Sequence, residues 1–532
     1  MPKSVCRTIA GVLSVAVVAG CGGGGGGGGG VSGGATTSTP AAALVWGQEA
    51  YVKAPNAGAT DQLGYSVAID GDTMVVGALG EASNQTTITN GSTASADNSV
   101  AWAGAAYVFR RSGTSWVQEA FLKAPNSGGG DFFGESVAVN GDTVVVGASG
   151  ESSNQTTITN GAAASADNSA ASAGAAYVYK RTGTTWAQEA YLKAPNAGAG
   201  DDFGYSVAVA GDTVVVGAHS EASNQTTITN GTTASADNSA AQAGAAYVFK
   251  RTGTAWAQQA YLKAANAGAN DEFGFSVAIH GDTVVVGAKG EASNQTTITN
   301  GTTASADDSA AAAGAAYVFK RSGTTWAQEA YLKAPNAGAG DHFGESVAIN
   351  GETIVVGASG EASSQTTPTN GTTASGNNSA LEAGAAYVFK RTGTTWAQEA
   401  YLKAPNAEAG DFFGASVALS GDIAVVGAPH ESSNRTTVIN GTSGSSDNSA
   451  ASAGAAYVFK RTGTTWARQA YLKAPNAESD DYFGISVAVS GTSVVAGAQR
   501  ESSSQTSVTN GTTASADNSA LNSGATYVFR YR

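Results

Sequence analysis

The sequence contains few of the residues from which enzyme sites are usually built. Of 532 residues, two are cysteines and four are histidines. Cys6 and Cys21 both lie near the N-terminus, so we expect no disulfide, no cysteine-ligated zinc and no cysteine nucleophile in the folded part of the chain. None of the histidines belongs to an arrangement of acid and nucleophile that can be recognised in the sequence. They are His219, His280, His342 and His430.

Other signals of catalysis or nucleic-acid binding are also missing. There is no nucleophile-elbow motif, no phosphate-binding loop and no dinucleotide fingerprint. The formal net charge of −14 argues against nucleic acid and anionic lipid head groups as electrostatic partners. After the N-terminal segment, no apolar run is long enough to cross a bilayer. We therefore expect a protein that is not an enzyme, needs no cofactor and does not bind nucleic acid.

The N-terminus has the pattern of a secretory signal. Lys3 and Arg7 precede a short apolar stretch, and small residues lead to Cys21. This stretch resembles the lipobox of bacterial lipoproteins, which implies a signal peptide over residues 1–20 and lipidation of Cys21. An ordinary signal peptide with an incidental cysteine is the alternative. The glycine-rich residues 21–42 are expected to form a flexible tether, so the protein would be lipid-anchored in the bacterial cell envelope, at the outer membrane or cell surface.

The rest of the chain is an array of near-identical units. An aspartate followed three residues later by glycine recurs every 70 residues, seven times, and the units fill residues 43–532. The aspartates are Asp61, Asp131, Asp201, Asp271, Asp341, Asp411 and Asp481.

Each unit predicts four antiparallel β-strands and no helix. In the second unit, the apolar runs 136–139 and 143–148 flank an Asn-Gly-Asp turn, and further strands are expected near residues 174–181 and 186–194. Seven such units predict an all-β, seven-bladed β-propeller. The array begins with a lone fourth strand and ends after a third strand, so we expect the N-terminal strand to close the ring by pairing with the C-terminal blade. An open solenoid is the alternative.

The unit resembles the FG-GAP repeats of the integrin α N-terminal β-propeller and, more closely, those of bacterial lipoproteins. Phe133-Gly134 and Val145-Val146-Gly147-Ala148 carry this resemblance, and the final proline of the motif occurs at Pro429. The integrin type binds calcium in a carboxylate-rich loop between the two motifs. Here the loop is a tight turn with one acid, Asp142, so the resemblance does not imply that metal site.

A long polar loop of about two dozen residues separates the second and third strands of each unit. Strand connectivity predicts that all seven loops lie on one face, each extended as a small polar hairpin around an Asn-Gly turn. We expect this face to bind a protein or glycan at the cell surface, as an adhesion or binding module. A passive spacer protein is the alternative. The candidate ligand-face residues are Asn84, Asn90, Asn154, Asn160, Asn224, Asn230, Asn294 and Asn300.

Two further alternatives stay open. If the long loop folds back, Glu151, Asn154, Asp167 and Asn168, with their equivalents in other units, would converge on a calcium ion and make adhesion calcium-dependent. The acids would otherwise cap turns or keep the face soluble. A catalytic site in the central channel of a propeller would leave no local motif in the sequence.

Overall fold

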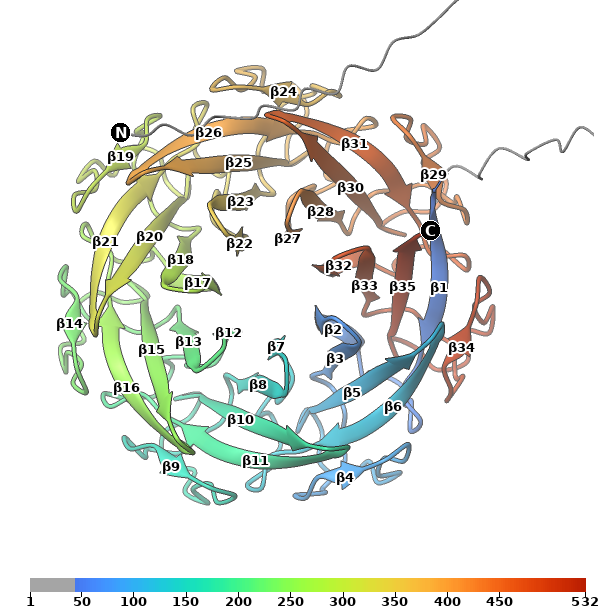
Figure 1. The fold of residues 1–532 in the computed structure, drawn as a ribbon, viewed down its shortest axis with the longest axis horizontal. Coiled ribbons are helices and arrows are strands. Elements are labelled where there is room, and N and C mark those ends of the chain that lie inside the picture. Colours follow the sequence, from blue (N-terminus) through green and yellow to red (C-terminus); the bar gives the residue numbers. More distant parts are fainter. Residues whose placement is uncertain (1–43) are drawn as a thin grey trace, which may run out of the picture. The chain divides into compact units, whose positions relative to one another are not determined.

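The computed structural model describes residues 44–532, which form a closed ring of seven β-sheets around a central axis (Figure 1). Residues 44–532 contain no helix that is long and apolar enough to span a bilayer. The predicted signal peptide (1–20), Cys21 and tether (21–42) lie outside the described residues. The predicted seven-bladed propeller is confirmed.

Each blade has five strands, one more than predicted. The second blade contains β7 (Val137–Asn140), β8 (Thr143–Ala148), β9 (Thr159–Asn160), β10 (Ala175–Thr182) and β11 (Thr185–Leu192), in the spatial order β7-β8-β10-β11-β9. All neighbours pair antiparallel. The extra strand is a two-residue segment of the long loop, which is too short to leave a period-two pattern in the sequence.

The other blades repeat this order. The innermost strands are β2 (Leu63–Asp70), β12 (Ser206–Ala210), β17 (Phe273–His280), β22 (Val347–Asn350), β27 (Ser416–Ser420) and β32 (Phe483–Ser490). The next are β3 (Thr73–Ala78), β13 (Thr213–Ala218), β18 (Thr283–Ala288), β23 (Thr353–Ala358), β28 (Ile423–Ala428) and β33 (Ser493–Ala498). The third are β5 (Ala105–Ser112), β15 (Ala245–Thr252), β20 (Ala315–Ser322), β25 (Ala385–Thr392), β30 (Ala455–Thr462) and β35 (Ala525–Tyr531).

The fourth strands are β1 (Trp46–Val52), β6 (Ser115–Leu122), β16 (Ala255–Leu262), β21 (Thr325–Leu332), β26 (Thr395–Leu402) and β31 (Thr465–Leu472). The outermost two-residue strands are β4 (Thr89–Asn90), β14 (Thr229–Asn230), β19 (Thr299–Asn300), β24 (Thr369–Asn370), β29 (Ile439–Asn440) and β34 (Thr509–Asn510).

The ring closes as predicted. The N-terminal strand β1 lies between β35 and β34 in the last sheet, whose order is β32-β33-β35-β1-β34. Its register runs from Trp46 opposite Tyr531 to Val52 opposite Thr526. Both ends of the array are therefore paired, and neither leaves a sheet edge open at the junction.

The FG and GA glycines bring neighbouring blades into backbone contact. A Cβ atom on Gly147 would lie 1.9 Å from the carbonyl oxygen of Gly204 in the next blade. The same oxygen accepts a hydrogen bond of 2.7 Å from the Ser136 hydroxyl. Gly204 has φ of +99°, a conformation that favours glycine. The motif therefore serves close blade packing.

The turn between the first two strands also joins blades. The carboxylate of Asp70 accepts a hydrogen bond of 2.7 Å from Gly141 N in the second blade, and the amide oxygen of Asn140 accepts one of 2.8 Å from Gly211 N in the third. Asp142, the acid of the turn, lies 2.7 Å from the Arg181 guanidinium. These side chains bind other groups of the protein. They lie at the end of the strands opposite the long loops.

Candidate functional site

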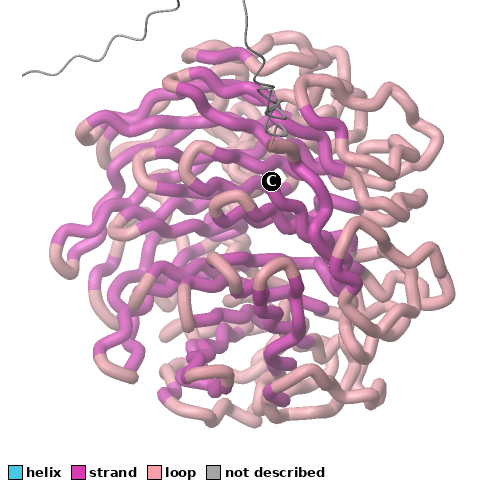
Figure 2. The backbone as a smooth tube through the Cα atoms, turned by 45° about the vertical axis from the view of Figure 1, so that its right-hand side comes forward, coloured by secondary structure: helices cyan, strands magenta, loops and turns pink. Residues whose placement is uncertain are grey.

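The long loops gather on one side of the strands (Figure 2). In the second unit the loop runs from residue 149 to 174. Its middle returns to the outer strand, where Asn160 pairs with Ala190 and Thr159 pairs with Tyr191. The prediction of a freely projecting hairpin is wrong, because the backbone of the loop finds hydrogen-bonding partners along the open edge of β11.

The asparagine at the tip of each loop clamps the next blade. The Asn160 side-chain oxygen accepts a hydrogen bond of 2.7 Å from Trp256 N, and its amide donates one of 3.3 Å to Trp256 O. Seven such pairs run around the rim, with N···O distances of 2.7–2.8 Å for the first bond. Among the candidate ligand-face residues, these contacts occupy Asn90, Asn160, Asn230 and Asn300.

The other four candidates, Asn84, Asn154, Asn224 and Asn294, are exposed. The backbone N–H of Asn154 donates 3.2 Å to the Asp167 carboxylate, which also accepts from Ser169 N and Oγ. These hydrogen bonds, those of Ser169 first, lower the pKa of Asp167. Gln155 adds bonds to Thr157 O and Thr159 Oγ1. The loop is thus held in shape by its own side chains, and the Asn154 side chain points to a surface that a ligand can reach.

Glu151, the first acid of the calcium hypothesis, is buried inside the blade. Its carboxylate lies 2.9 Å from Lys193 Nζ and accepts hydrogen bonds from the Tyr191 hydroxyl and the Asn126 amide. Burial lowers the pKa of Lys193, and the charge of Glu151 opposes that shift. The same glutamate–lysine pair occurs in every blade at 2.9–3.1 Å.

The structure does not bring the calcium set together. Glu151 is 1% exposed and engaged by Lys193, whereas Asp167 and Asn168 lie on the surface of the loop. Within residues 44–532, no three histidine, cysteine, aspartate or glutamate side chains are grouped so that they could hold a metal ion. The repeated glutamate has a structural role instead, since a buried lysine needs a counter-ion.

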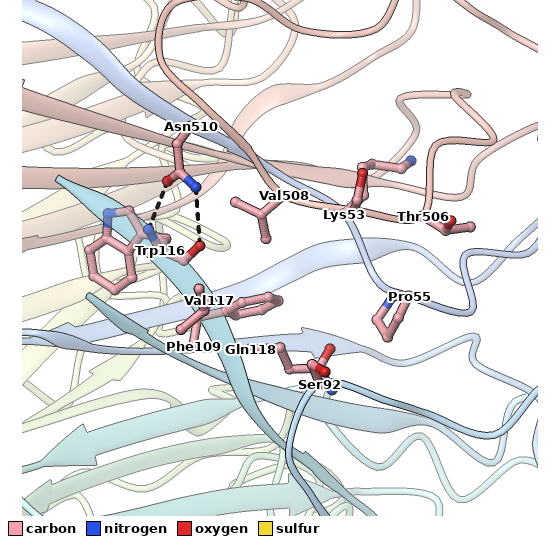
Figure 3. A pocket seen from close by; sticks show the side chains of 11 residues that line it. Lys53, Pro55, Ser92, Phe109, Trp116, Val117, Gln118, Thr506, Val508 and Asn510 are labelled. Atoms are coloured by element: carbon pink, nitrogen blue, oxygen red, sulfur yellow. Dashed lines mark hydrogen bonds between the residues drawn. The ribbon is translucent and has the colours of Figure 1, made fainter. Parts of the chain in front are cut away.

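A groove lies between neighbouring blades on the long-loop side (Figure 3). One such groove has a volume of about 290 Å³ and is lined by Pro55, Trp116, Gln118, Thr506 and Val508. Its two walls come from different blades, joined at one end by the Asn510–Trp116 clamp.

The groove recurs at a second place on the ring. A second groove of about 290 Å³ is lined by the residues at equivalent positions two units earlier, including Thr366, Pro368, Pro405 and Trp466. Wider depressions lie on the other side of the clamps, at the end of the strands opposite the long loops. The one beside Asn230 measures about 780 Å³ and contains the Arg321–Asp282 ion pair.

Reasoning from the sequence overlooked a set of side chains at the inner end of the blades. We call it the axial ring: the residue after each FG motif and the residue after each GA motif. In chain order it comprises Tyr65, Leu79, Glu135, Ser149, Tyr205, His219, Phe275, Lys289, Glu345, Ser359, Ala415, Pro429, Ile485 and Gln499.

Contacts join the axial ring between the third and fourth blades. The His219 ring lies 4.2 Å from the Tyr205 ring of its own blade and 5.6 Å from the Phe275 ring of the next blade, between centroids. Burial, followed by the charge of Lys289, lowers the pKa of His219 to about 4. His342 and His430 occur directly before FG and two residues after GA, beside ring positions, whereas His280 ends β17 at the opposite face. A comparison of the seven units position by position would have found the ring.

The match to a known repeat family agrees with the fold. The FG-GAP repeat pattern matches residues 46–109, 116–179, 186–249, 256–319, 326–389, 396–459 and 466–529. A search of curated proteins found no match. Among solved structures, the phage phi92 endosialidase is similar at 9% identity, over 92% of this chain and 69% of that chain, with a TM-score of 0.36. The seven matched segments cover most of the sequence, and the chain belongs to the FG-GAP repeat family.

Proposed function

We propose that the protein is a lipid-anchored binding module of the bacterial cell envelope that holds a polar chain, a glycan or an extended protein segment, on its long-loop face without catalysis. The observation that carries this proposal is the recurrence of one groove between blades, with equal volume at two places two units apart. Pro55, Trp116 and Thr506 of the first groove recur as Pro405, Trp466 and Thr366 of the second, whereas Arg468 replaces Gln118 and Pro368 replaces Val508. Repetition lets weak contacts act together on one extended ligand.

The lining of the groove favours a neutral polar ligand. Pro55 and Val508 supply an apolar floor, and Gln118 and Thr506 supply hydrogen-bonding groups at its side. Sugars present apolar C–H faces together with hydroxyls, and binding sites for such ligands combine apolar surface with a few placed polar groups. Anchoring through Cys21 would present this face at the cell surface.

An array of glycans and extracellular-matrix proteins, probed with the full chain, tests the proposal. The decisive variant replaces by glutamate the exposed loop threonine that lines the two grooves, Thr506 and Thr366, and its equivalent in every other unit. The seven positions are Thr86, Thr156, Thr226, Thr296, Thr366, Thr436 and Thr506. We expect this variant to lose binding, because an added carboxylate in each groove must be desolvated by any neutral ligand that enters.

The matched control carries glutamate at six exposed threonines of the turn between the third and fourth strands. These are Thr114, Thr184, Thr254, Thr324, Thr394 and Thr464. This variant adds a similar charge at the opposite face and should bind as the wild type does. Loss of binding in the control, with binding kept in the loop variant, would move the ligand to the other face and refute the proposal.

A further inference from the structure

The two grooves of equal volume differ by one charged side chain. Gln118 lines the first groove, which Figure 3 shows, and Arg468 lines the second at the same unit position. The other five units also have glutamine at this position, namely Gln48, Gln188, Gln258, Gln328 and Gln398. The second groove therefore differs from the first by a positive charge.

The guanidinium group of Arg468 is buried and has few partners. Arg468 is 4% exposed. Its Nε atom donates a hydrogen bond of 3.3 Å to Gly441 O, whereas its Nη1 and Nη2 atoms have no acceptor among the described residues. Burial lowers the pKa of Arg468 to about 10, and Tyr457 opposes this shift. A buried cation in this state is costly unless an acceptor reaches it.

The glutamine of another blade donates more hydrogen bonds from this position. The amide nitrogen of Gln398 donates to Gly371 O and to Thr373 O, both at 3.1 Å, in the long loop of its own blade. Its amide oxygen has no donor in residues 44–532, but it carries no charge. Arg468 keeps only the equivalent of the first bond, to Gly441 O. The exchange of glutamine for arginine therefore adds a charge and leaves two nitrogen atoms without an acceptor.

The long loop beside Arg468 also differs from its equivalents. Gly444 stands where the other six units have alanine. A Cβ atom on Gly444 would lie 2.7 Å from Asn406 Oδ1 and 2.7 Å from Pro405 Cγ, so the loop lies closer to these residues than an alanine would allow. Pro405 and Thr442 line the same groove as Arg468. One wall of this groove is therefore shaped by a second change in the same blade.

Nothing in the groove balances the charge of Arg468. Among residues 44–532, no aspartate or glutamate lines the groove. The other cation of the lining, Lys403, already lies 2.9 Å from the carboxylate of Glu361. The groove thus combines one uncompensated positive charge with the apolar rings of Pro368 and Pro405.

We propose that the second groove binds the carboxylate of an acidic sugar unit, a hexuronate, with Arg468 as its cation and Pro368 and Pro405 beside the sugar ring. The N–H groups of a guanidinium match the two oxygens of a carboxylate. The volume of about 290 Å³ is close to the lower end of small-molecule sites, about 300–1,000 Å³, which suits a single ring. This inference rests on the proposed function, because it takes the groove as a ligand site, and it narrows the glycan to one with acidic units.

Binding requires a small movement of Arg468. Its Nη atoms are buried, so the ligand must draw the side chain toward the groove that it lines. The movement gives up one hydrogen bond, that of 3.3 Å to Gly441 O. Two charge-assisted hydrogen bonds to a carboxylate would replace it.

Titration of the full chain by saturation-transfer NMR tests this site. The probes are methyl β-glucuronide and the neutral methyl β-glucoside. We expect the glucuronide to bind about tenfold or more tightly than the glucoside, because charge-assisted hydrogen bonds are added. Arg468→Gln introduces the residue of the other six units and should remove this preference. The matched control, Arg435→Gln, removes an exposed arginine of the same blade that does not line the groove, and should keep the preference within about twofold.

The reverse exchange should create a second site. Gln118→Arg combined with Ala94→Gly places both changes of the sixth blade in the first, and should about double the glucuronide bound at saturation in equilibrium dialysis. If this variant does not fold, Arg468→Gln still decides the matter. A third probe, Nα-acetyl-glutamate amide, represents a protein carboxylate. If it binds more tightly than the glucuronide and loses binding in Arg468→Gln, the site belongs to a protein ligand and the proposal is overturned.

The outcomes separate this inference from the proposed function. Equal binding of the two sugars, or a preference that survives Arg468→Gln, overturns the inference alone. Absence of binding by both sugars overturns it as well, and the proposed function is then decided by the ligand array and the loop-threonine variant. If that array finds no ligand that depends on the loop threonines, the proposed function fails too.

Discussion

The residues at the rim of this propeller repeat from unit to unit, whereas the residues at its axis differ. At the rim, seven asparagine–tryptophan clamps and seven buried glutamate–lysine pairs repeat with nearly constant distances. At the axis, the positions after FG and GA vary from aromatic to acidic to basic. A closed ring needs seven equivalent junctions, so contacts between blades are conserved in every unit. The positions at the axis lie outside these clamps and pairs, so their residues can differ from unit to unit.

The comparison also separates the polar groups that are paired with an opposite charge from those that are not. Glu151 and Glu135 are both carboxylates of the second unit and both are withdrawn from water. Glu151 is paired with Lys193 at 2.9 Å. Glu135 has Ser149 alone as a hydrogen-bond donor among the described residues. Removing Glu151 should therefore cost stability.

The largest expected effect comes from breaking a buried pair at the rim. Lys193→Met leaves Glu151 charged and buried without its counter-ion, which costs about 3–5 kcal/mol of unfolding free energy. Chemical denaturation measures the loss. The double variant Lys193→Met with Glu151→Leu should recover part of it, because the uncompensated charge is gone. If the single variant were as stable as the wild type, the pair would not support the blade.

Next in size is a methyl group added where two blades touch. In Gly147→Ala the new Cβ would lie 1.9 Å from the Gly204 carbonyl oxygen, so the blades must separate. Overpacking of this kind costs about 1–3 kcal/mol. The control, Gly161→Ala, has nothing within 4 Å of the added carbon and only its φ of +104° to oppose it. Equal melting temperatures of the two variants would contradict the role assigned to the FG and GA glycines.

An effect of similar size is expected at the asparagine clamps. Asn160→Ala removes two hydrogen bonds to the Trp256 backbone, one of 2.7 Å and one of 3.3 Å. At about 0.5–1.5 kcal/mol for each bond, a loss of roughly 1–3 kcal/mol follows. Asn154→Ala, six residues earlier in the same loop, is exposed and should change stability by less than about 0.5 kcal/mol. Thermal unfolding of the two variants distinguishes a clamp from a surface residue.

The prediction from the sequence succeeded where the pattern repeats and failed where the answer depends on neighbouring blades. The period of 70 residues and the alternation around Trp186 predicted the blades and the ring closure. The asparagines of the loop tips looked like ligand groups because nothing in one unit shows that Asn160 contacts Trp256 of the next blade. Glu151 suggested calcium for a different reason: Lys193, its partner, belongs to the same blade but lies 42 residues further along the chain.

A pH-dependent effect is expected at the aspartate that precedes each FG motif. Burial raises the pKa of Asp131 to about 7, although the hydrogen bond from Gly128 N opposes the shift. The six equivalents shift likewise. Because the folded pKa lies above the unfolded value of 3.8, the folded state binds more protons between these two values. Stability from this group is therefore fully present below about pH 4 and is lost as the pH rises through about 7.

Asp131→Asn tests this dependence, because the amide keeps an acceptor for Gly128 N and cannot ionise. Its unfolding free energy should fall less between pH 5 and pH 8 than that of the wild type. Asp167→Asn is the control at the loop surface: the folded pKa of Asp167 is lowered by its hydrogen bonds, so its protons matter only below that range. Identical slopes for Asp131→Asn and the wild type would show that Asp131 is ionised throughout. The repeated aspartates would then belong with the charged pairs of the rim.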